Sequence, residues 1–178
     1  AFEPLSEFRN YSIITVTPDV VAKITLSPNN SIMPAGNGLF HSATAYDKWN
    51  NVNSSAKTWG VNDSAASVNS TGFFNSTTPG AYFVNVTVDG IIVNTSFVTV
   101  TPNNVSTISL TPLSSSTPAG IGQNFSATAF DKWGNVNSST ISWGTNSSLG
   151  ASSFNTTSGN SAFFNDTVAL VYKVNASV

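Results

Sequence analysis

A sequence of 27 residues occurs twice in this 178-residue chain and establishes its organisation. The first copy is Pro34-Ala-Gly-Asn-Gly-Leu-Phe-His-Ser-Ala-Thr-Ala-Tyr-Asp-Lys-Trp-Asn-Asn-Val-Asn-Ser-Ser-Ala-Lys-Thr-Trp-Gly60. The second copy runs from Pro118 to Gly144 at a constant offset of 84, and 18 of the 27 positions are identical. Self-similarity at a fixed period indicates that one structural unit is repeated. The chain therefore contains two similar units of about 80 residues each.

Both units consist of short segments in which apolar and polar residues alternate. Clear examples are residues 22–28, 81–88, 96–100 and 125–130, and Gly, Pro and Asn turns separate them. Alternation with a period of two, rich in Val, Ile, Thr and aromatic residues, is typical of half-buried β-strands, and Asp89-Gly90 is a hairpin turn signal. The spacing suits a seven-stranded sandwich. The sequence thus predicts an all-β chain of two tandem sandwiches, without a helix.

The composition argues against most classes of enzyme and against nucleic-acid binding. Charged residues make up 8% of the chain, the six Lys and Arg residues are scattered, and the net charge is −2. Because there is no Cys and only one His, we expect no cofactor and no metal site. A hydrolase would need a base and an orienting group beside its nucleophile, so we expect no catalytic residues. No apolar run approaches the roughly 18 residues of a membrane span.

Most asparagines stand in N-x-[S/T] glycosylation sequons. These begin at 15 of the 22 Asn residues, where chance predicts about six. A glycan coat hydrates a surface without charge, so we interpret the pattern as N-glycosylation of an extracellular, cell-surface protein. A composition bias in β-rich turns is the alternative. The sequon residues are Asn10, Asn29, Asn53, Asn62, Asn69, Asn75, Asn85, Asn94, Asn104, Asn124, Asn137, Asn146, Asn155, Asn165 and Asn175.

The first residues, Ala1-Phe2-Glu3-Pro4, show no signal peptide, so the chain is interpreted as a mature, secreted product. Extracellular proteins of this size commonly carry disulfides, and this chain has no Cys. We therefore expect the fold to depend on packing alone, unless another kind of crosslink is present.

The repeated motif resembles the first half of a bacterial immunoglobulin-like domain of the invasin type. In that family a strand of the Ala-Thr-Ala type leads into an Asp-x-x-Gly-Asn turn. Asp131-Lys-Trp-Gly-Asn135 fits this turn fully, whereas Asp47-Lys-Trp-Asn-Asn51 has Asn50 where Gly is usual. The resemblance covers both repeats and implies two immunoglobulin-like β-sandwiches. It supports a fold rather than a function.

A strand-like segment also stands at the N-terminus, where no unit precedes it. Residues 10–18, Asn-Tyr-Ser-Ile-Ile-Thr-Val-Thr-Pro, resemble residues 94–102, the expected last strand of the first unit. A gapless alignment of residues 81–97 with 162–178 leaves the second unit without most of its closing strand. We therefore expect a donor-strand tail at residues 1–19, a first domain at 20–102 and a second, acceptor domain at 103–178.

The tail is expected to complete the second domain of another copy. Residue 18 leads straight into the first domain, so a return within the chain is too short, and a head-to-tail contact that does not close produces an open filament. Tyr11 and Ile13 would face one side of the strand. Ile14 and Val16 would face the other side and fill the groove of the neighbour. The alternative is that the tail pairs as an edge strand of its own first domain.

This arrangement resembles the archaeal extracellular thread filament subunit, a glycosylated two-domain protein polymerised by donor-strand exchange. The resemblance implies a structural subunit that binds identical subunits head to tail, carries covalent N-glycans, and binds no nucleic acid. It also implies isopeptide links between subunits, for which Lys23 and Lys173 are the candidates. The alternatives are a monomeric adhesin, a carbohydrate-binding module, or a fragment of a surface layer or stalk.

The remaining polar and aromatic constellations have structural interpretations. Trp59 and Trp143 are expected in the cores, whereas Trp49 and Trp133 either cover the end of a core or stack on sugars or on a neighbour. Asp47 and Asp131 each begin a loop with two further Asn side chains. Calcium usually needs more carboxylates than that, so an Asx-type turn is favoured. His41 is expected to be a packed or surface side chain.

Overall fold

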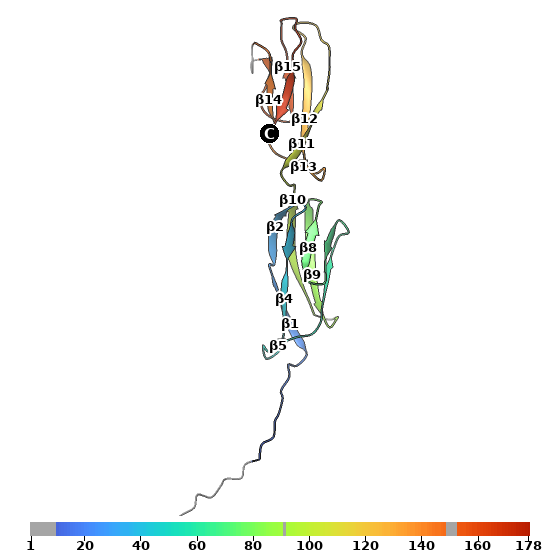
Figure 1. Ribbon diagram of the computed structural model, residues 1–178, viewed down its shortest axis with the longest axis vertical. Helices are drawn as coiled ribbons and strands as arrows, with labels where there is room; N and C mark the ends of the chain where they lie inside the picture. The colour runs from blue at the N-terminus through green and yellow to red at the C-terminus, as the bar shows by residue number, and fades with distance from the viewer. Residues whose placement is uncertain (1–9, 91, 149–152) are drawn as a thin grey trace, which may run out of the picture.

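Residues 21–101 form a β-sandwich in the computed structural model, which describes residues 10–90, 92–148 and 153–178 (Figure 1). Two three-stranded sheets, β1-β4-β5 and β3-β8-β7, pack against the four-stranded sheet β2-β10-β9-β6. All neighbouring strands are antiparallel except β10 and β2, which run parallel. The strands are β1 (Val21–Ser27), β2 (Asn30–Pro34), β3 (Gly38–Phe40), β4 (Ser42–Asp47), β5 (Val52–Asn53), β6 (Lys57–Val61), β7 (Ala66–Val68), β8 (Phe73–Ser76), β9 (Gly80–Val88) and β10 (Ile92–Thr101).

The period-two alternation of the sequence builds the first core. Val84, Val86 and Val88 of β9 are buried, and the residues between them face outward or lie half-buried. On β10, Ser96, Val98 and Val100 are 0%, 0% and 2% exposed, so this strand covers the core between β2 and β9. Burial of these apolar side chains stabilises the sandwich.

Residues 105–177 form a second sandwich with fewer strands. Its strands are β11 (Val105–Thr111), β12 (Gln123–Asp131), β13 (Val136–Asn137), β14 (Ser142–Thr145), β15 (Ser161–Phe164) and β16 (Val174–Ser177). β12 pairs with β11, β13 and β15, while β14 and β16 form a separate two-stranded sheet. The core between them contains Ile141, Trp143, Phe154 and Phe164. The tryptophans expected in the cores lie there: Trp143 is buried, and the half-buried Trp59 packs on both clusters of the first core.

The pairing of the strands shows which parts of the two sandwiches correspond. Trp59 of β6 lies opposite Val86 of β9, and Trp143 of β14 lies opposite Ala176 of β16. Two tyrosines mark the same correspondence, because each hydroxyl donates to the carbonyl of the fourth residue before it: Tyr82 to Thr78 and Tyr172 to Val168, both at 2.8 Å. β16 therefore occupies the place of β9.

The gapless alignment of residues 81–97 with 162–178 is wrong. Phe163 and Phe164 of β15 pair with β12, as Phe73 and Phe74 of β8 pair with β3. Phe163 fills the space above Gly122 in the same way that Phe73 fills the space above Gly38. The likeness of the segments that begin at Ala81 and Ala162 concealed this, because both place two aromatic residues after an alanine. In the second sandwich, β10 as a whole has no counterpart among the described residues.

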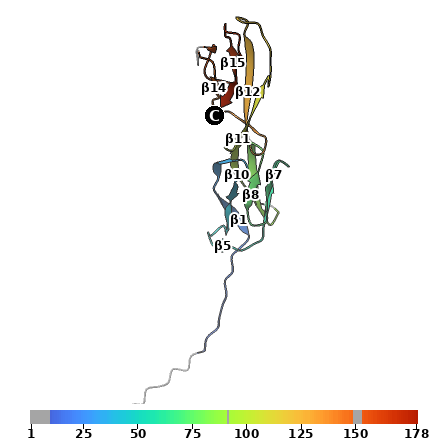
Figure 2. The same cartoon turned by 45° about the horizontal axis from the view of Figure 1, so that its top comes forward.

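The two sandwiches lie end to end along one axis (Figures 1 and 2). Residues 10–19 form no strand and extend away from the free end of the first sandwich. The far end of the second sandwich includes residues 113–122, coloured yellow in Figure 1. The tail and this far end therefore lie at opposite ends of the molecule. In the part of the chain that is described, no helix is long and apolar enough to cross a membrane.

Candidate functional site

The second sandwich has an open groove on the side where β10 would lie. The groove has a volume of about 690 Å³ and is lined by residues 115–119, Ile121, Gln123, Phe125, Phe164, Asp166 and residues 168–174 without Lys173. Val168, Leu170 and Val171 along its rim are exposed apolar residues. A groove with apolar side chains in its walls, beside an unpaired strand edge, can accept another strand.

The walls of the groove correspond to the two strands that flank β10 in the first sandwich. Residues 114–118 occupy the repeat position of β2, and residues 170–178 occupy that of β9. In the first sandwich β10 lies between them, parallel to β2 and antiparallel to β9. In the second sandwich, residues 114–118 form no strand. The groove is thus the space that β10 fills in the complete unit.

The tail carries the sequence features of the strand that the groove lacks. The repeat offset of 84 places Ser12, Ile14 and Val16 at the positions of Ser96, Val98 and Val100, which are the inward residues of β10. In the structure this segment lies in solvent. Tyr11, Ile13, Ile14 and Val16 are 79%, 92%, 84% and 88% exposed. An apolar segment with this much exposed area is typical of an interaction site.

Two polar side chains of β10 show how such a strand is held in register. The Asn94 amide donates to the Ile24 carbonyl at 2.8 Å, and the Ser96 hydroxyl donates to the Pro28 carbonyl at 2.7 Å. The tail has Asn10 and Ser12 at these positions, and the second sandwich has Ile108 and Pro112 where the acceptors stand. The polar groups needed for the same register are therefore present on both sides.

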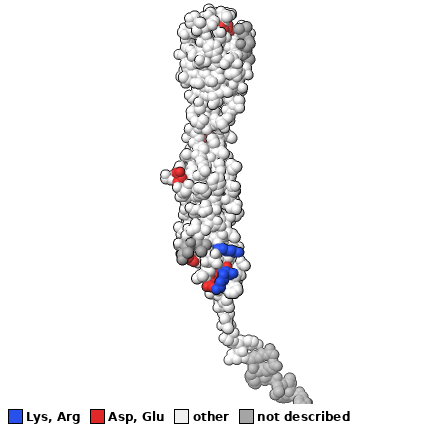
Figure 3. All heavy atoms as spheres, turned by 180° about the vertical axis from the view of Figure 1, so that it is seen from behind, with Lys and Arg blue, Asp and Glu red and all other residues white. Residues whose placement is uncertain are grey.

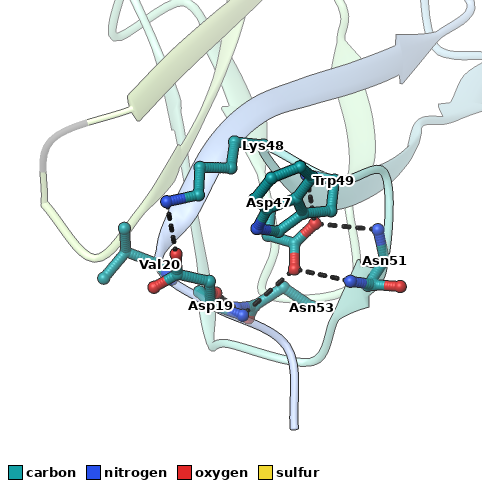
Figure 4. A network of polar contacts seen from close by, with 7 residues as sticks. All are labelled: Asp19, Val20, Asp47, Lys48, Trp49, Asn51 and Asn53. Atoms are coloured by element: carbon teal, nitrogen blue, oxygen red, sulfur yellow. Dashed lines mark hydrogen bonds and ion pairs between the residues drawn. The ribbon is translucent and has the colours of Figure 1, made fainter. Parts of the chain in front are cut away.

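The Asp-Lys-Trp loops form the Asx-type turns expected from the sequence (Figure 4). The Asp47 carboxylate accepts the backbone N–H groups of Trp49 and Asn51, both at 2.8 Å, the Asn51 amide at 2.9 Å, and the Asp19 N–H at 3.1 Å. Asp131 accepts the equivalent groups of Trp133, Asn135 and Asn103. Among the described residues, no three His, Cys, Asp or Glu side chains are grouped to hold a metal.

These turns hold the two carboxylates in their charged form. Desolvation by burial raises the pKa of Asp131, but hydrogen bonds from the Asn135 side chain and the backbone N–H groups of Asn103, Asn135 and Trp133 outweigh it and lower the pKa to about 2. The pKa of Asp47 is lowered to about 2 for the same reasons. A carboxylate that accepts several N–H groups resists protonation.

None of the 15 sequon asparagines is buried. Nine are exposed, and the half-buried ones are Asn53, Asn75, Asn85, Asn94, Asn137 and Asn165. Figure 3 shows a surface with few charged side chains, of which the blue ones gather near the end that bears the tail. The nine exposed sequon side chains thus lie where a glycan could extend into solvent.

The lysines proposed for isopeptide links are both exposed. The Lys23 amine donates to Asn50 Oδ1 at 2.7 Å and lies 5.1 Å from the Tyr46 ring centre. Lys173 stands between the groove-lining residues Tyr172 and Val174 and does not line the groove itself, and its backbone N–H donates to Asn146 Oδ1. Their role between subunits stays a prediction. His41 is buried, and its Nε2 lies 3.1 Å from the Ser96 hydroxyl under β10.

Comparisons with known proteins identify the fold. No protein-family profile matches the sequence, and no curated protein matches it. The Escherichia coli adhesin FdeC is similar over 90% of this chain and 61% of its own, with a TM-score of 0.58 and 16% identity. The four N-terminal immunoglobulin domains of Dscam1 match over 90% and 44%, with a TM-score of 0.54 and 12% identity. Invasin, a bacterial integrin-binding protein, matches over 90% and 37%, with a TM-score of 0.50 and 18% identity.

These similarities confirm the prediction of an all-β chain of immunoglobulin-like sandwiches. The chain spans about 61% of the FdeC structure and less than half of the other two. Sequence reasoning missed the walls of the groove, residues 115–121 and 168–174, because the wrong alignment assigned the second wall to a different strand. The hydroxyl-bonded tyrosines Tyr82 and Tyr172 are the signal that could have found it.

We expect the stability of the chain to fall as the pH drops from about 4 to 2. The pKa of Asp131 is lowered from 3.8 to about 2 on folding, so its contribution is complete above the unfolded value and is lost as the pH falls through the folded value. Asp131→Asn should lower the unfolding temperature at pH 7. It should also make the unfolding temperature fall less steeply between about pH 4 and 2, the range called the acid limb. Asp63→Asn is the control, because Asp63 is an exposed turn residue that accepts one N–H, from Ala65. Equal acid limbs in thermal unfolding of Asp131→Asn and the parent chain would contradict the assignment.

We expect N-glycan occupancy to follow the hydrogen bonds of the sequon amides. The amide nitrogens of Asn53, Asn94 and Asn137 donate to backbone carbonyls at 2.9, 2.8 and 2.7 Å, and this nitrogen is the one a glycan would occupy. Site-resolved glycopeptide mass spectrometry should find several-fold lower occupancy at these three sites than at exposed Asn104 and Asn146. Equal occupancy at Asn137 and Asn146 would contradict this prediction.

Proposed function

We propose that the chain is a non-enzymatic structural subunit of an extracellular, N-glycosylated cell-surface filament. In this proposal residues 10–18 of one copy insert into the groove of the second sandwich of the next copy. The observation that carries it is the match between the two parts: the groove has the place and walls of β10, and the tail repeats the inward residues of β10. The resemblance to the archaeal thread subunit supports the same assignment, and the fold shared with the adhesin FdeC supports the cell-surface location alone.

The register of the inserted strand follows from the first sandwich. Val98 of β10 lies opposite Tyr82 of β9, and Val100 lies opposite Met33 of β2. The corresponding pairs between copies are Ile14 with Tyr172 and Val16 with Thr117. Ile13 takes the outward place of Phe97, opposite Lys173. Strand addition of this kind pairs both open rows of backbone groups and covers the core at once.

The position of the tail favours donation to another copy over insertion into the same chain. The tail extends from one end of the molecule, while residues 113–122 of the groove wall lie at the far end of the second sandwich (Figures 1 and 2). The complete first sandwich stands between the two. Because donor and acceptor are different surfaces of each copy, the contact is heterologous and continues into a filament unless its rotation closes a ring.

Ile14→Asp and Ile13→Asp, made in the full chain, test the proposal with the same substitution at neighbouring positions. Ile14→Asp places a carboxylate where β10 buries Val98 against the core, which costs roughly 3 kcal/mol or more and should weaken strand binding at least about a hundredfold. Ile13→Asp faces outward beside Lys173 and should be tolerated. Electron microscopy and light scattering should show long filaments for the parent chain and Ile13→Asp, and monomers for Ile14→Asp.

A peptide of residues 10–18 provides the second arm of this experiment. Added to the Ile14→Asp chain, it should bind saturably and raise the unfolding temperature, because it fills the vacant place of β10. The same peptide with aspartate at position 14 is the control. A parent chain that stays monomeric, or an Ile13→Asp chain as defective as Ile14→Asp, would overturn strand donation and favour a monomeric adhesin.

A further inference from the structure

The contact between the two sandwiches of one chain is built from a glycine turn and an Asp-anchored loop. Trp133 lies directly over Gly36, where an added Cβ would stand 2.4 Å from the indole Nε1 and φ is +78°. The Asn135 amide donates to the Thr77 carbonyl at 2.8 Å, and the Asn103 amide donates to the Ala35 carbonyl at 2.8 Å. Only glycine leaves room for the ring at this position.

The Asp-anchored loop of this contact has a counterpart at the end of the molecule that bears the tail, where it is exposed to solvent. Trp49 and Asn51 stand at the repeat positions of Trp133 and Asn135, and Asp47 anchors them with the same set of hydrogen bonds (Figure 4). The contact between the two sandwiches of one chain is called the internal joint. Trp133 in the internal joint is 47% exposed, whereas Trp49 is 70% exposed. The Asn51 side chain and the backbone at Trp49 are therefore held in place, but the contact surface is in solvent.

The glycine turn of the contact also has a counterpart, which is exposed at the opposite end of the molecule. The Gly120 N–H donates to the Asp166 carbonyl at 2.9 Å, as the Gly36 N–H donates to the Ser76 carbonyl at 2.8 Å. Gly120 has φ +79°, and no atom of the described residues lies within 4 Å of an added Cβ. The place that Trp133 takes on Gly36 is thus formed and vacant on Gly120.

We propose that the loop with Trp49 and Asn51 docks on the turn with Gly120 and Thr167 of the neighbouring copy. This inference rests on the proposed function, because the inserted tail delivers the loop to the turn. Pro18 leads into Asp19 as Pro102 leads into Asn103, at the same offset from the strand and from the loop. When the tail of one copy is inserted in the register of β10, the first sandwich of that copy is placed on the second sandwich of its neighbour. This arrangement is the same as that of the second sandwich on the first within one chain. Thr167 supplies the carbonyl that corresponds to that of Thr77.

One residue makes the joint between copies different from the joint within a chain. Asp19 stands where Asn103 donates its amide to Ala35, and a carboxylate cannot donate this hydrogen bond. Asp19 instead pairs with Lys48 at 3.2 Å and accepts the Val20 N–H at 2.8 Å. The joint between copies lacks one hydrogen bond of the internal joint, so we expect it to be the more flexible of the two.

Cysteine crosslinking tests this joint cleanly, because the chain has no cysteine of its own. Asn51→Cys with Thr167→Cys places the two thiols at opposite ends of one chain, so a disulfide can form only between copies. Asn135→Cys with Thr77→Cys makes the equivalent change at the internal joint and is the matched control. On oxidation, the first pair should give a ladder of covalent multimers on a denaturing gel, and the second pair an intramolecular link without a ladder.

Acrylamide quenching of Trp49 fluorescence gives a second readout, taken as the difference between the parent chain and Trp49→Phe. In filaments Trp49 should be at least about twofold less accessible than in Ile14→Asp monomers, because it would lie on Gly120. Filaments in which Trp49 stays as accessible as in monomers would overturn the joint, as would filaments without a ladder when the internal pair crosslinks. Neither result would contradict strand donation, which fails only if the parent chain forms no filaments.

Discussion

An immunoglobulin-like sandwich of this chain needs a strand between the positions of β2 and β9, and the rest of the structure depends on that requirement. In the first sandwich, Val98 and Val100 of β10 cover the core while the backbone pairs on both sides. Among the described strands, β10 is the only sheet neighbour of β2. A segment at the position of β2 therefore has nothing to pair with where β10 is missing, which explains why residues 114–118 form no strand. The groove follows from one missing element rather than from two.

The buried carboxylates Asp47 and Asp131 fix how the chain enters each sandwich after the preceding strand. Each binds the N–H group of the residue that enters its sandwich, Asp19 or Asn103, and also the turn that carries the tryptophan. Entry of the chain and direction of the tryptophan are thus held by one side chain. Because this arrangement is internal to each unit, it does not depend on whether the strand before the entry residue lies in a sandwich of the same chain or in one of another copy.

The repeat made most of the fold predictable, and the limits of prediction lie where the repeat changes its spacing. Residues 10–60 and 94–144 keep the offset of 84, so the strands, the turns and the inward residues of the tail could be assigned from their counterparts. Further along, Tyr82 and Tyr172 correspond at an offset of 90, because the second unit has six more residues between Gly144 and Phe163. A local likeness after Ala81 and Ala162 outweighed this insertion in the alignment. The pairing of the strands, which joins residues distant in sequence, resolves the alignment.

The contact between Gly36 and Trp133 could not be predicted from the sequence, for a different reason. Gly36 and Gly120 both follow Pro-Ala and have φ of +78° and +79°, yet among the described residues a ring lies above Gly36 and none above Gly120. Nothing local distinguishes a glycine required by its own turn from one required by an approaching aromatic ring. The distinction depends on how two sandwiches stack, and that depends on the loops at both ends of the stack.

The differences between the tail and β10 fit a strand that binds across a boundary between molecules. Ile14 stands where β10 has Val98, and one more buried methylene adds about 0.8 kcal/mol of apolar transfer energy. Within a chain, covalent connection holds β10 beside its core, so no such addition is required. At the joint between copies the binding is weaker than within a chain, because Asp19 cannot make the hydrogen bond that Asn103 donates. A filament built this way would bind its strands tightly and bend at the joints between copies, which suits a thin fibre under mechanical load.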